Sequence, residues 1–537
     1  MHMKRIFRFL TVLVLAGCAG DQAPKTNWYA EYGTLETSTP VALQYGSPDL
    51  QPGDVTDNLL GAPVHRMAVM LPLSGDAADT GRAIQTAIEA ATLQSAPQNL
   101  SIAFYDTAAD INTAIADVLS TEPEIIIGPV FSDDVRTLRD AKPDALPVLA
   151  FTSDAAALGN GVMTMALLPT NGTEAIVREM AADKVTGFII LAPDTESGHL
   201  MAGTAYNAAQ IYNIPVNGIF FYTEHNSNSI KDVTIVASMN AARSAANTRA
   251  REVLSDILTN ERLTTIEKSS LNIQLERMSK MDVIGELPYD AVLFLGNGDD
   301  TESLASFLRY YGVGTHDARF YGTALWDGSD IAGDFTMNGA KYTALSPMQP
   351  SFTSLYERIS GTLPTRLAGF GYDAANMAMG MIYSHKSDAA YLLDPSGYAG
   401  ASGLYRLKPN GENERALQIM QIVAGGESQV VKTAPVNFLS PLYNLEQSKI
   451  KPIESMDLET PGVNPDDYIS IPQRLREKYE SETYGAHMTK PVTSHPFETI
   501  TILPEDDRDI VVTTPDFQPI NLESVNRTYI DSVEIEE

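Results

Sequence analysis

Cysteine is almost absent from this chain: Cys18 is the only one among 537 residues. A single cysteine forms no intrachain disulfide and no zinc site built from several thiolates. The eight histidines are well separated along the sequence, and their spacing matches no metal-binding motif. We therefore expect stability to come from packing, and we expect no metal and no other cofactor.

Positive charge is scarce as well. The chain has 37 Lys and Arg against 68 Asp and Glu, a formal net charge of −31. Nucleic-acid binding depends on clustered basic side chains that displace counterions, so this composition argues against a nucleic-acid partner. Hydrophobic residues make up 44% of the chain, enough for ordinary cores, and the length predicts two or more domains.

Catalytic motifs are also lacking. The sequence contains no G-x-S-x-G, no H-E-x-x-H, and no S-x-x-K accompanied by its partner motifs. The stretch GNGDDTESL (296–304) lacks the Gly-Lys-Ser/Thr ending of a phosphate loop, and it predicts a strand-to-helix turn instead. These absences favour a protein that recognises a partner or ligand and is not an enzyme.

The N-terminus has the features of a secretory signal. Three basic residues within the first eight precede an apolar stretch, 9–15, that is too short to span a bilayer. Residues 15–18, LAGC, resemble the lipobox of bacterial lipoproteins, which implies that Cys18 is diacylated and becomes the mature N-terminus. The alternative is a buried free cysteine. By the sorting rule of such lipoproteins, Ala19 implies the outer membrane, with the protein facing the periplasm.

The rest of the chain divides into segments that differ in composition and in hydrophobic pattern. Residues 19–64 mix Pro, Gly, Asp and Thr without a period and predict a flexible linker. From residue 65 to 434, fully apolar short runs alternate with helical patterns in two successive sets. Apolar strands separated by helices predict parallel sheets covered on both faces, so we expect an α/β fold with two Rossmann-like lobes.

Two segments depart from this alternation. Residues 228–284 are too long for a plain loop, and their helical spacing of apolar residues predicts one or two amphipathic helices. This insertion either elaborates the second lobe or docks a partner. Residues 435–537 contain 20 acidic and 8 basic residues with scattered proline, which predicts a largely disordered acidic tail. Within the tail, residues 510–512 are a candidate linear motif that pairs with a sheet edge.

Eight stretches carry a resemblance to a known family. The first five occur in the order found in type I periplasmic solute-binding proteins of the branched-chain amino-acid class: 71–91, 102–119, 125–138, 146–158 and 188–209. The last three resemble penicillin-binding protein activator lipoproteins, a subgroup of the same fold: 320–331, 363–381 and 403–422. The enterobacterial members also have a large N-terminal helical-repeat domain, whereas a short linker precedes Met67 here, so no function of that domain is implied.

This resemblance implies a fold and a function, and it leaves a second function open. The fold is that of a type I periplasmic binding protein, and the implied function is an outer-membrane lipoprotein that binds and activates a peptidoglycan synthase, a penicillin-binding protein, to regulate cell-wall synthesis. The helical insertion and the acidic tail are the candidate contact surfaces. The alternative is a lipid-anchored receptor of an ABC transporter for branched-chain amino acids, which closes around a small-molecule ligand in the interlobe cleft.

The ligand-binding candidates follow from the same resemblance. In the amino-acid-binding relatives, hydroxyl groups and backbone N–H groups after the fourth strand hold the ligand carboxylate. Ala150 and Asp154 stand where the family has a serine and a threonine, so the carboxylate clamp is expected to be broken. A register shift of two residues would restore it through Thr152 and Ser153, with Ser74 as a further cleft candidate. Asp154 either binds a cationic or hydroxylated ligand or caps a turn.

Overall fold

The computed structural model describes residues 41–42, 64–260, 262–384, 386–438, 451–459, 462–472 and 475. Cys18, almost all of the predicted linker 19–64, and the predicted motif 510–512 lie outside the described residues. The compact unit described below ends at Pro472.

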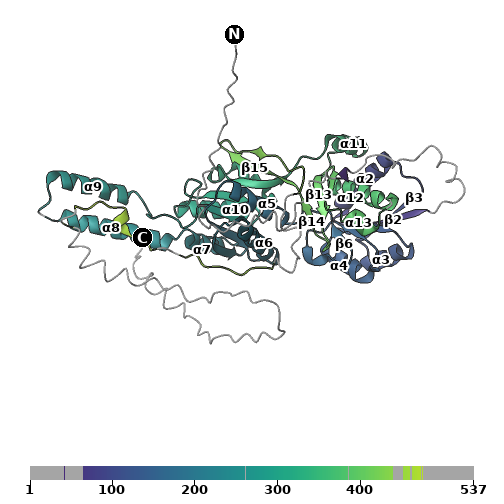
Figure 1. Cartoon of the computed structure of the whole chain (residues 1–537), viewed down its shortest axis with the longest axis horizontal. Helices are drawn as coiled ribbons and strands as arrows, with labels where there is room; N and C mark the ends of the chain where they lie inside the picture. The colour runs from purple at the N-terminus through teal and green to yellow at the C-terminus, as the bar shows by residue number, and fades with distance from the viewer. Residues whose placement is uncertain are drawn as a thin grey trace, which may run out of the picture. The chain divides into compact units, whose positions relative to one another are not determined.

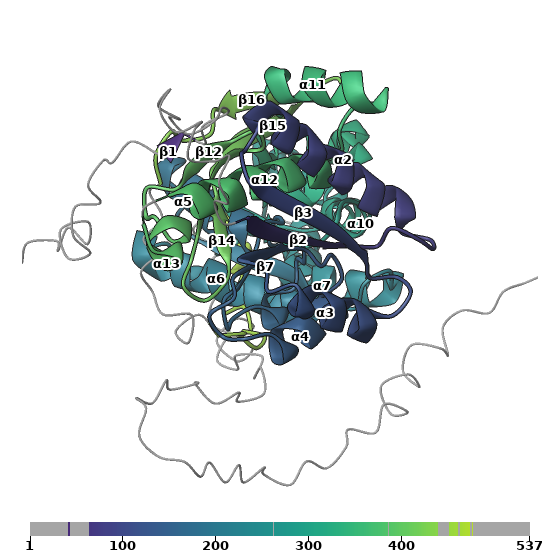
Figure 2. The same cartoon turned by 90° about the vertical axis from the view of Figure 1, so that its right-hand side faces the viewer.

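The first lobe is built on a five-stranded parallel sheet in the order β3-β2-β4-β5-β6. Its strands are β2 (His65–Leu71), β3 (Leu100–Asp106), β4 (Ile125–Ile127), β5 (Val148–Ala150) and β6 (Val162–Thr164). Helices α2 (Ala78–Ser95) and α12 (Arg366–Tyr383) cover one face, and α3 (Ile111–Ser120) and α4 (Ser132–Ala141) cover the other (Figure 2). Because both faces are covered, β2 is apolar almost throughout: Met67 and Val69 belong to one core and Ala68 and Met70 to the other.

Helix α12 reaches the first lobe although it follows the strands of the second lobe in sequence. Its small residues allow α2 to approach closely, and a β-carbon at Gly371 would press against Ile84. Tyr372, Asp373 and the methionines of GYDAANMAMGM (371–381) are buried, so this stretch belongs to the core of the first lobe. Helices α11 (Pro350–Ser360) and α13 (Asp388–Leu392) flank it.

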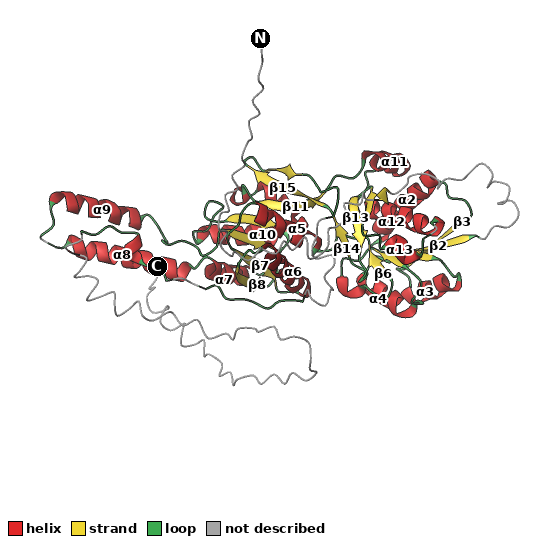
Figure 3. Ribbon diagram, viewed as in Figure 1, coloured by secondary structure: helices red, strands yellow, loops and turns green. Residues whose placement is uncertain are grey.

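The sheet of the second lobe repeats the parallel strand arrangement of the first sheet and adds two antiparallel strands. The strands lie in the order β16-β15-β11-β10-β9-β7-β8. They are β7 (Phe188–Pro193), β8 (Val216–Tyr222), β9 (Ala291–Phe294), β10 (Arg319–Gly322) and β11 (Lys341–Leu345), all parallel, followed by the antiparallel β15 (Leu417–Val423) and β16 (Glu427–Lys432). Helices α5 (Asn171–Ala182) and α6 (Glu196–Tyr212) pack on one face, and α7 (Ser227–Ala237) and α10 (Gly298–Tyr310) on the other. Figure 3 shows the strands of each lobe between their helices.

A small third sheet lies beside the first lobe. It has the order β1-β12-β13-β14, with β1 (Val41–Ala42), β12 (Tyr398–Gly400), β13 (Gly403–Leu407) and β14 (Asn413–Arg415). The last strand leads directly into β15 of the second lobe. The predicted fold class, an α/β protein with two parallel-sheet lobes, is confirmed.

The predicted insertion 228–284 contains two kinds of structure. Its first part is α7, whose Ile230 and Ala237 belong to the core of the second lobe. The remainder forms a helical hairpin, α8 (Asn240–Leu258) and α9 (Thr265–Ser279), which projects from that lobe (Figure 1). The hairpin α8–α9 is therefore the true insertion, and it begins later than the sequence pattern indicated.

Polar side chains, buried at the base and exposed at the turn, fix both ends of the hairpin α8–α9. At its base, the Arg243 guanidinium donates to the carbonyls of Ser238, Gly285 and Gly312. Between the helices, the Asn247 amide donates to the carbonyl of Met278 at 3.3 Å. At the start of α9, Thr264 and Glu267 form a capping box, in which each side chain bonds the other residue's backbone N–H. The hairpin is thus held at its base and has a defined second helix.

Candidate functional site

The cleft residues predicted from the sequence lie at the carboxyl ends of first-lobe strands. Ser74 follows β2, and Thr152, Ser153 and Asp154 follow β5. In open α/β sheets, ligands bind outside the carboxyl ends of the strands. The position of these residues therefore suits a binding site. Their ability to bind a ligand depends on whether their polar atoms are already hydrogen-bonded within the protein.

Ser74 is engaged with an aspartate at the end of β3. Asp106 accepts hydrogen bonds from the Ser74 hydroxyl and N–H, from the Leu73 N–H at 2.9 Å and from the Ala108 N–H at 3.0 Å. Burial raises the pKa of Asp106, but these hydrogen bonds together lower it below its ordinary value of 3.8. Ser74 therefore binds a neighbouring carboxylate that stays ionised at neutral pH.

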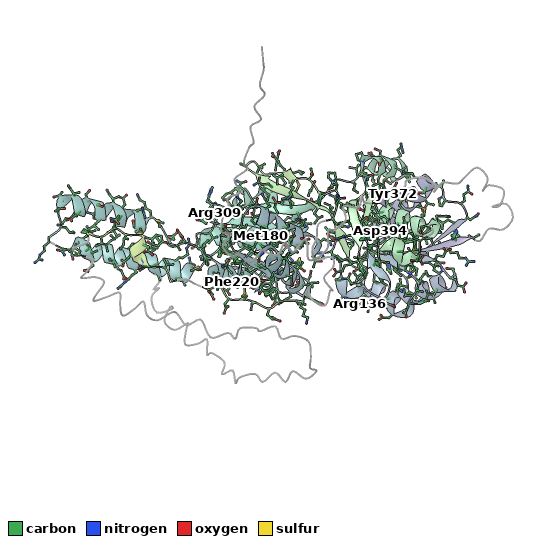
Figure 4. All side chains as sticks on the ribbon, viewed as in Figure 1. Arg136, Met180, Phe220, Arg309, Tyr372 and Asp394 are labelled. Atoms are coloured by element: carbon green, nitrogen blue, oxygen red, sulfur yellow. The ribbon has the colours of Figure 1, made fainter. Side chains whose placement is uncertain are left out.

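The segment after β5 is also bonded internally. The Thr152 hydroxyl accepts from the Asp154 N–H at 3.1 Å, and the buried Thr152 carbonyl accepts from the Thr164 hydroxyl at 2.6 Å. Asp154 caps the short 3-10 helix Ala155–Ala157 by accepting from the Ala156 N–H at 2.9 Å. Its second oxygen pairs with Arg136 of α4, which Figure 4 labels.

These contacts give three of the four predicted cleft residues a structural role. Thr152 and Asp154 are joined to each other, whereas Ser74 is bonded to Asp106; Ser153 is exposed to solvent. Among the described residues, no hydrogen bond joins Ser74 to Thr152, Ser153 or Asp154. Arg136 was not predicted, because nothing in the sequence links a helix-surface arginine to a turn 18 residues later.

The connections between the lobes form a second polar cluster. Within the described residues, the chain passes between the lobes three times: from β6 to α5, from β11 to α11, and from β14 to β15. The Asn413 amide donates to the carbonyls of Thr164 at 2.9 Å and Ala166 at 2.6 Å, and the Asn171 amide donates to the Asn413 carbonyl at 2.8 Å. The first and third connections are therefore held together directly.

The middle connection is held in the same way. The Arg366 guanidinium donates to the Ser346 carbonyl at 2.7 Å, and the Gln418 amide donates to the Leu345 carbonyl at 3.3 Å. Arg366 of the first lobe also lies 3.6 Å from Asp327 of the second lobe. Polar side chains thus fasten all three connections to neighbouring backbone.

Arg415 is the central cation of this cluster. Its guanidinium donates to the Met165 carbonyl and, at 3.1 Å, to the hydroxyl of Ser402, which itself donates to Asp373. The guanidinium carbon lies 4.1 Å from the centroid of the Phe370 ring. Burial lowers the pKa of Arg415 to about 10, although Asp373 favours the charged form, so the side chain remains protonated at neutral pH. Tyr372, the neighbour of Asp373, is labelled in Figure 4.

A pocket of about 300 Å³, open solvent included, lies beside the third connection. It is lined by charged residues of both lobes together with Phe438. Glu174 pairs with Arg178 at 3.0 Å, and Glu414 pairs with Arg406 at 2.7 Å. The carboxylates of the pocket thus already have cationic partners, whereas the buried Nε of Arg415 in its lining has no hydrogen-bond partner.

No cluster of His, Cys, Asp and Glu suited to a metal ion occurs within the described residues. None of the helices described is both long enough and apolar enough to cross a bilayer.

Comparison with known families identifies part of the sequence. Residues 50–214 match the family described as "LppC putative lipoprotein". The match confirms, over those residues, the family resemblance drawn from the sequence. No curated protein matches the chain.

Solved structures with a similar chain path include regulators and solute-binding proteins. The LpoA C-domain from Haemophilus influenzae, described as a regulator of PBP1A, is 16% identical, with 68% of this chain and 99% of that chain covered and a TM-score of 0.46. Full-length LpoA from Haemophilus influenzae is 16% identical over 72% of this chain and 62% of that one, with a TM-score of 0.47. The leucine-binding protein LivK from Thermotoga maritima is 16% identical over 69% and 99%, with a TM-score of 0.42.

Proposed function

We propose that this protein is a lipid-anchored regulator without catalytic activity of its own, which binds a peptidoglycan synthase from the periplasmic face of the outer membrane and activates it. The proposal rests on the lipoprotein family match of residues 50–214 and on the activator-like stretches after residue 320. The mechanism is a shift of the synthase toward its active state through tighter binding to that state.

The observation that carries the choice of a regulator over a solute receptor is the environment of Asp154. At the position of the family's clamp threonine, its carboxylate is neutralised by Arg136 and bonded to the Ala156 N–H. A ligand carboxylate at this turn would meet an anion whose nearest cation is already paired. The first-lobe cleft is therefore poorly suited to amino acids, which the alternative function requires.

The hairpin α8–α9 is the surface that we assign to the synthase. On α9, Ile266 and Ile273 are 82% and 65% exposed, seven residues apart and thus on one helix face. Residues 240–281 contain seven Lys and Arg against five Asp and Glu, although the chain as a whole has a net charge of −31. An exposed apolar stripe on an arm that does not share the large negative charge of the chain suits a partner surface with an apolar centre.

Equilibrium binding separates the two functions. The lipid-free chain is titrated with purified bifunctional peptidoglycan synthases, and separately examined by thermal shift with branched-chain amino acids. The regulator proposal expects saturable binding of a synthase and no thermal shift with the amino acids. A thermal shift with an amino acid and no binding of any synthase would instead establish the receptor.

The lipid anchor makes a further prediction. Replacing Cys18 with alanine should release the protein from the membrane fraction, because no acyl chains are attached and stable anchoring needs more than one chain. Membrane and soluble fractions are compared by immunoblot for the wild type and Cys18→Ala. If Cys18→Ala remained in the membrane fraction, the lipobox assignment would be wrong. Anchoring raises the effective concentration near a membrane-bound partner, so the released variant should also activate less well in cells.

A further inference from the structure

The segment 451–472 packs along the second lobe and is called the strap here. Residues 451–459 and 462–472 of the strap are described, and their only regular element is the short helix Pro465–Asp467. Composition placed this segment in the acidic tail. Its contacts instead join three parts of the second lobe: α6, the edge strand β8 and the hairpin α8–α9.

At the sheet, the strap covers an exposed edge. β8 is the last strand of the seven-stranded sheet, and Ile219 and Met456 exchange two backbone hydrogen bonds, of 2.8 and 3.0 Å. Two positions later, Leu458 is buried in the core of the lobe. The strap thus satisfies backbone groups that an unpaired edge would leave open.

At α6, the strap backbone comes unusually close to the helix. A β-carbon on Gly203 would overlap the carbonyl oxygen of Lys451, so this approach requires glycine. One turn earlier, the His199 carbonyl accepts from the Ile453 N–H at 3.3 Å. The His199 ring faces the same residue, with Nδ1 2.8 Å from the Ile453 carbonyl oxygen.

At the other end, the strap lies on the hairpin. The Gln274 amide of α9 forms two hydrogen bonds with the Ser470 backbone, donating to its carbonyl at 3.1 Å and accepting from its N–H at 2.7 Å. The neighbouring Ile469 and Ile471 are buried. The short helix of the strap contacts α8. The strap is therefore a physical link between α6 and the hairpin.

His199 is placed between two acceptors and stacked on Phe221. Nε2 lies 2.9 Å from the Asp194 carboxylate, Nδ1 faces the Ile453 carbonyl, and the ring centroid is 3.8 Å from that of Phe221 of β8. A neutral imidazole has one N–H and can donate to one acceptor, whereas an imidazolium donates to both. The neutral ring therefore donates to only one of these two acceptors, whereas the imidazolium holds the Asp194 carboxylate and the Ile453 carbonyl at the same time.

We propose that the strap is a proton-dependent brace: protonated His199 holds it against α6, and neutral His199 loosens it and, through Gln274, frees the hairpin α8–α9. This inference does not depend on the proposed function, because it concerns only contacts within the second lobe.

The direction of the pH effect follows from the charges around His199. Burial lowers the pKa of His199. Its hydrogen bonds to Asp194 and Ile453 raise the pKa, as do the negative charges of Asp194 after β7 and of Glu454 on the strap. The net effect is a pKa above the ordinary value of 6.5. A raised pKa in the bound state means that the stabilisation is complete below about pH 6.5 and is lost as the pH rises through the pKa of the bound state.

Hydrogen–deuterium exchange measures the brace directly. The full chain carrying Cys18→Ala, so that it is not acylated, is compared at pH 5.5 and pH 8.5 after correction for intrinsic exchange. We expect the amides of Ile453, Met456 and Ser470 and those of α9 to exchange about three- to tenfold faster at the higher pH, the effect of losing one hydrogen bond. Amides of α2 and α12 in the first lobe should not change.

Two substitutions with matched controls separate the steps. In His199→Gln the pH dependence should disappear, whereas the exposed His316→Gln should retain it. In Gly203→Ala the strap should exchange fast at both pH values, while α6 itself is preserved because alanine favours the helix; Gly333→Ala, where a β-carbon meets open space, should behave as wild type. The proposal is overturned if the pH dependence survives in His199→Gln, or if Gly203→Ala releases the strap without faster exchange in α9.

Discussion

Replacing Arg415 with methionine is expected to destabilise the protein by about 3–5 kcal/mol. Methionine keeps much of the length and apolar contact of the side chain, but it leaves the buried Asp373 without its cation and the Met165 carbonyl without its donor. Arg415 links the third connection between the lobes to the first connection. The substitution therefore removes contacts in the region that joins the two lobes. We expect the midpoint of thermal unfolding to fall by on the order of 10 °C.

Denaturant and thermal unfolding followed by circular dichroism measure this effect. Arg82→Met is the matched control, since Arg82 pairs with Asp79 on the surface and should change stability by about 0.5 kcal/mol or less. The double variant Asp373→Ala/Arg415→Met should lose less than the sum of the two single variants, because it leaves no buried charge unpaired. If Arg415→Met were as stable as Arg82→Met, the cluster would not hold the lobes together.

Replacing Ile266 and Ile273 with serine is expected to weaken synthase binding about tenfold or more. Both side chains are exposed on α9, so the substitutions remove apolar contact area from a docking surface without opening a cavity in the fold. Thermal stability should therefore stay within about 0.5 kcal/mol of the wild type. This combination, lost binding in a fully folded protein, is what distinguishes a contact surface from a structural element.

The control for this experiment is an exposed leucine elsewhere. Leu93 on α2 is 71% exposed, and Leu93→Ser should leave synthase binding unchanged. The dissociation constant of each variant is measured by titration with the purified synthase at one fixed salt concentration. Equal binding by the wild type and Ile266→Ser/Ile273→Ser would exclude this face of the hairpin. The alternative of deleting residues 228–284 is unsuitable, because it would remove α7 and with it part of the lobe core.

The alternation of strands and helices was predictable because the central strands are buried on both faces. Runs such as Ile125–Ile127 and Phe188–Pro193 are apolar throughout, and no other role suits them in a chain of this composition. The hairpin was predictable as helix from its spacing of apolar residues. Its start was not, because α7 and α8 follow each other within three residues and both are amphipathic.

The strap and the Arg415 cluster were not predictable from local sequence. Ile453, Met456 and Leu458 are isolated apolar residues in an acidic, proline-containing segment, and only the folded surface of α6 and β8 gives them apolar neighbours. Asp154 lies after β5, whereas its partner Arg136 comes from another element, α4. Contacts between residues distant in sequence depend on the folded arrangement, and a single sequence records no pairing between them.

Activation of a synthase is tested most directly by the rate of glycan-chain polymerisation by a purified peptidoglycan synthase, measured with lipid-linked precursor with and without a saturating amount of this protein. We expect a higher rate with the wild type, a smaller increase with Ile266→Ser/Ile273→Ser, and an undiminished increase with Leu93→Ser. A rate that is the same with and without the wild-type protein, for every synthase of the same cell envelope, would contradict the proposed activation.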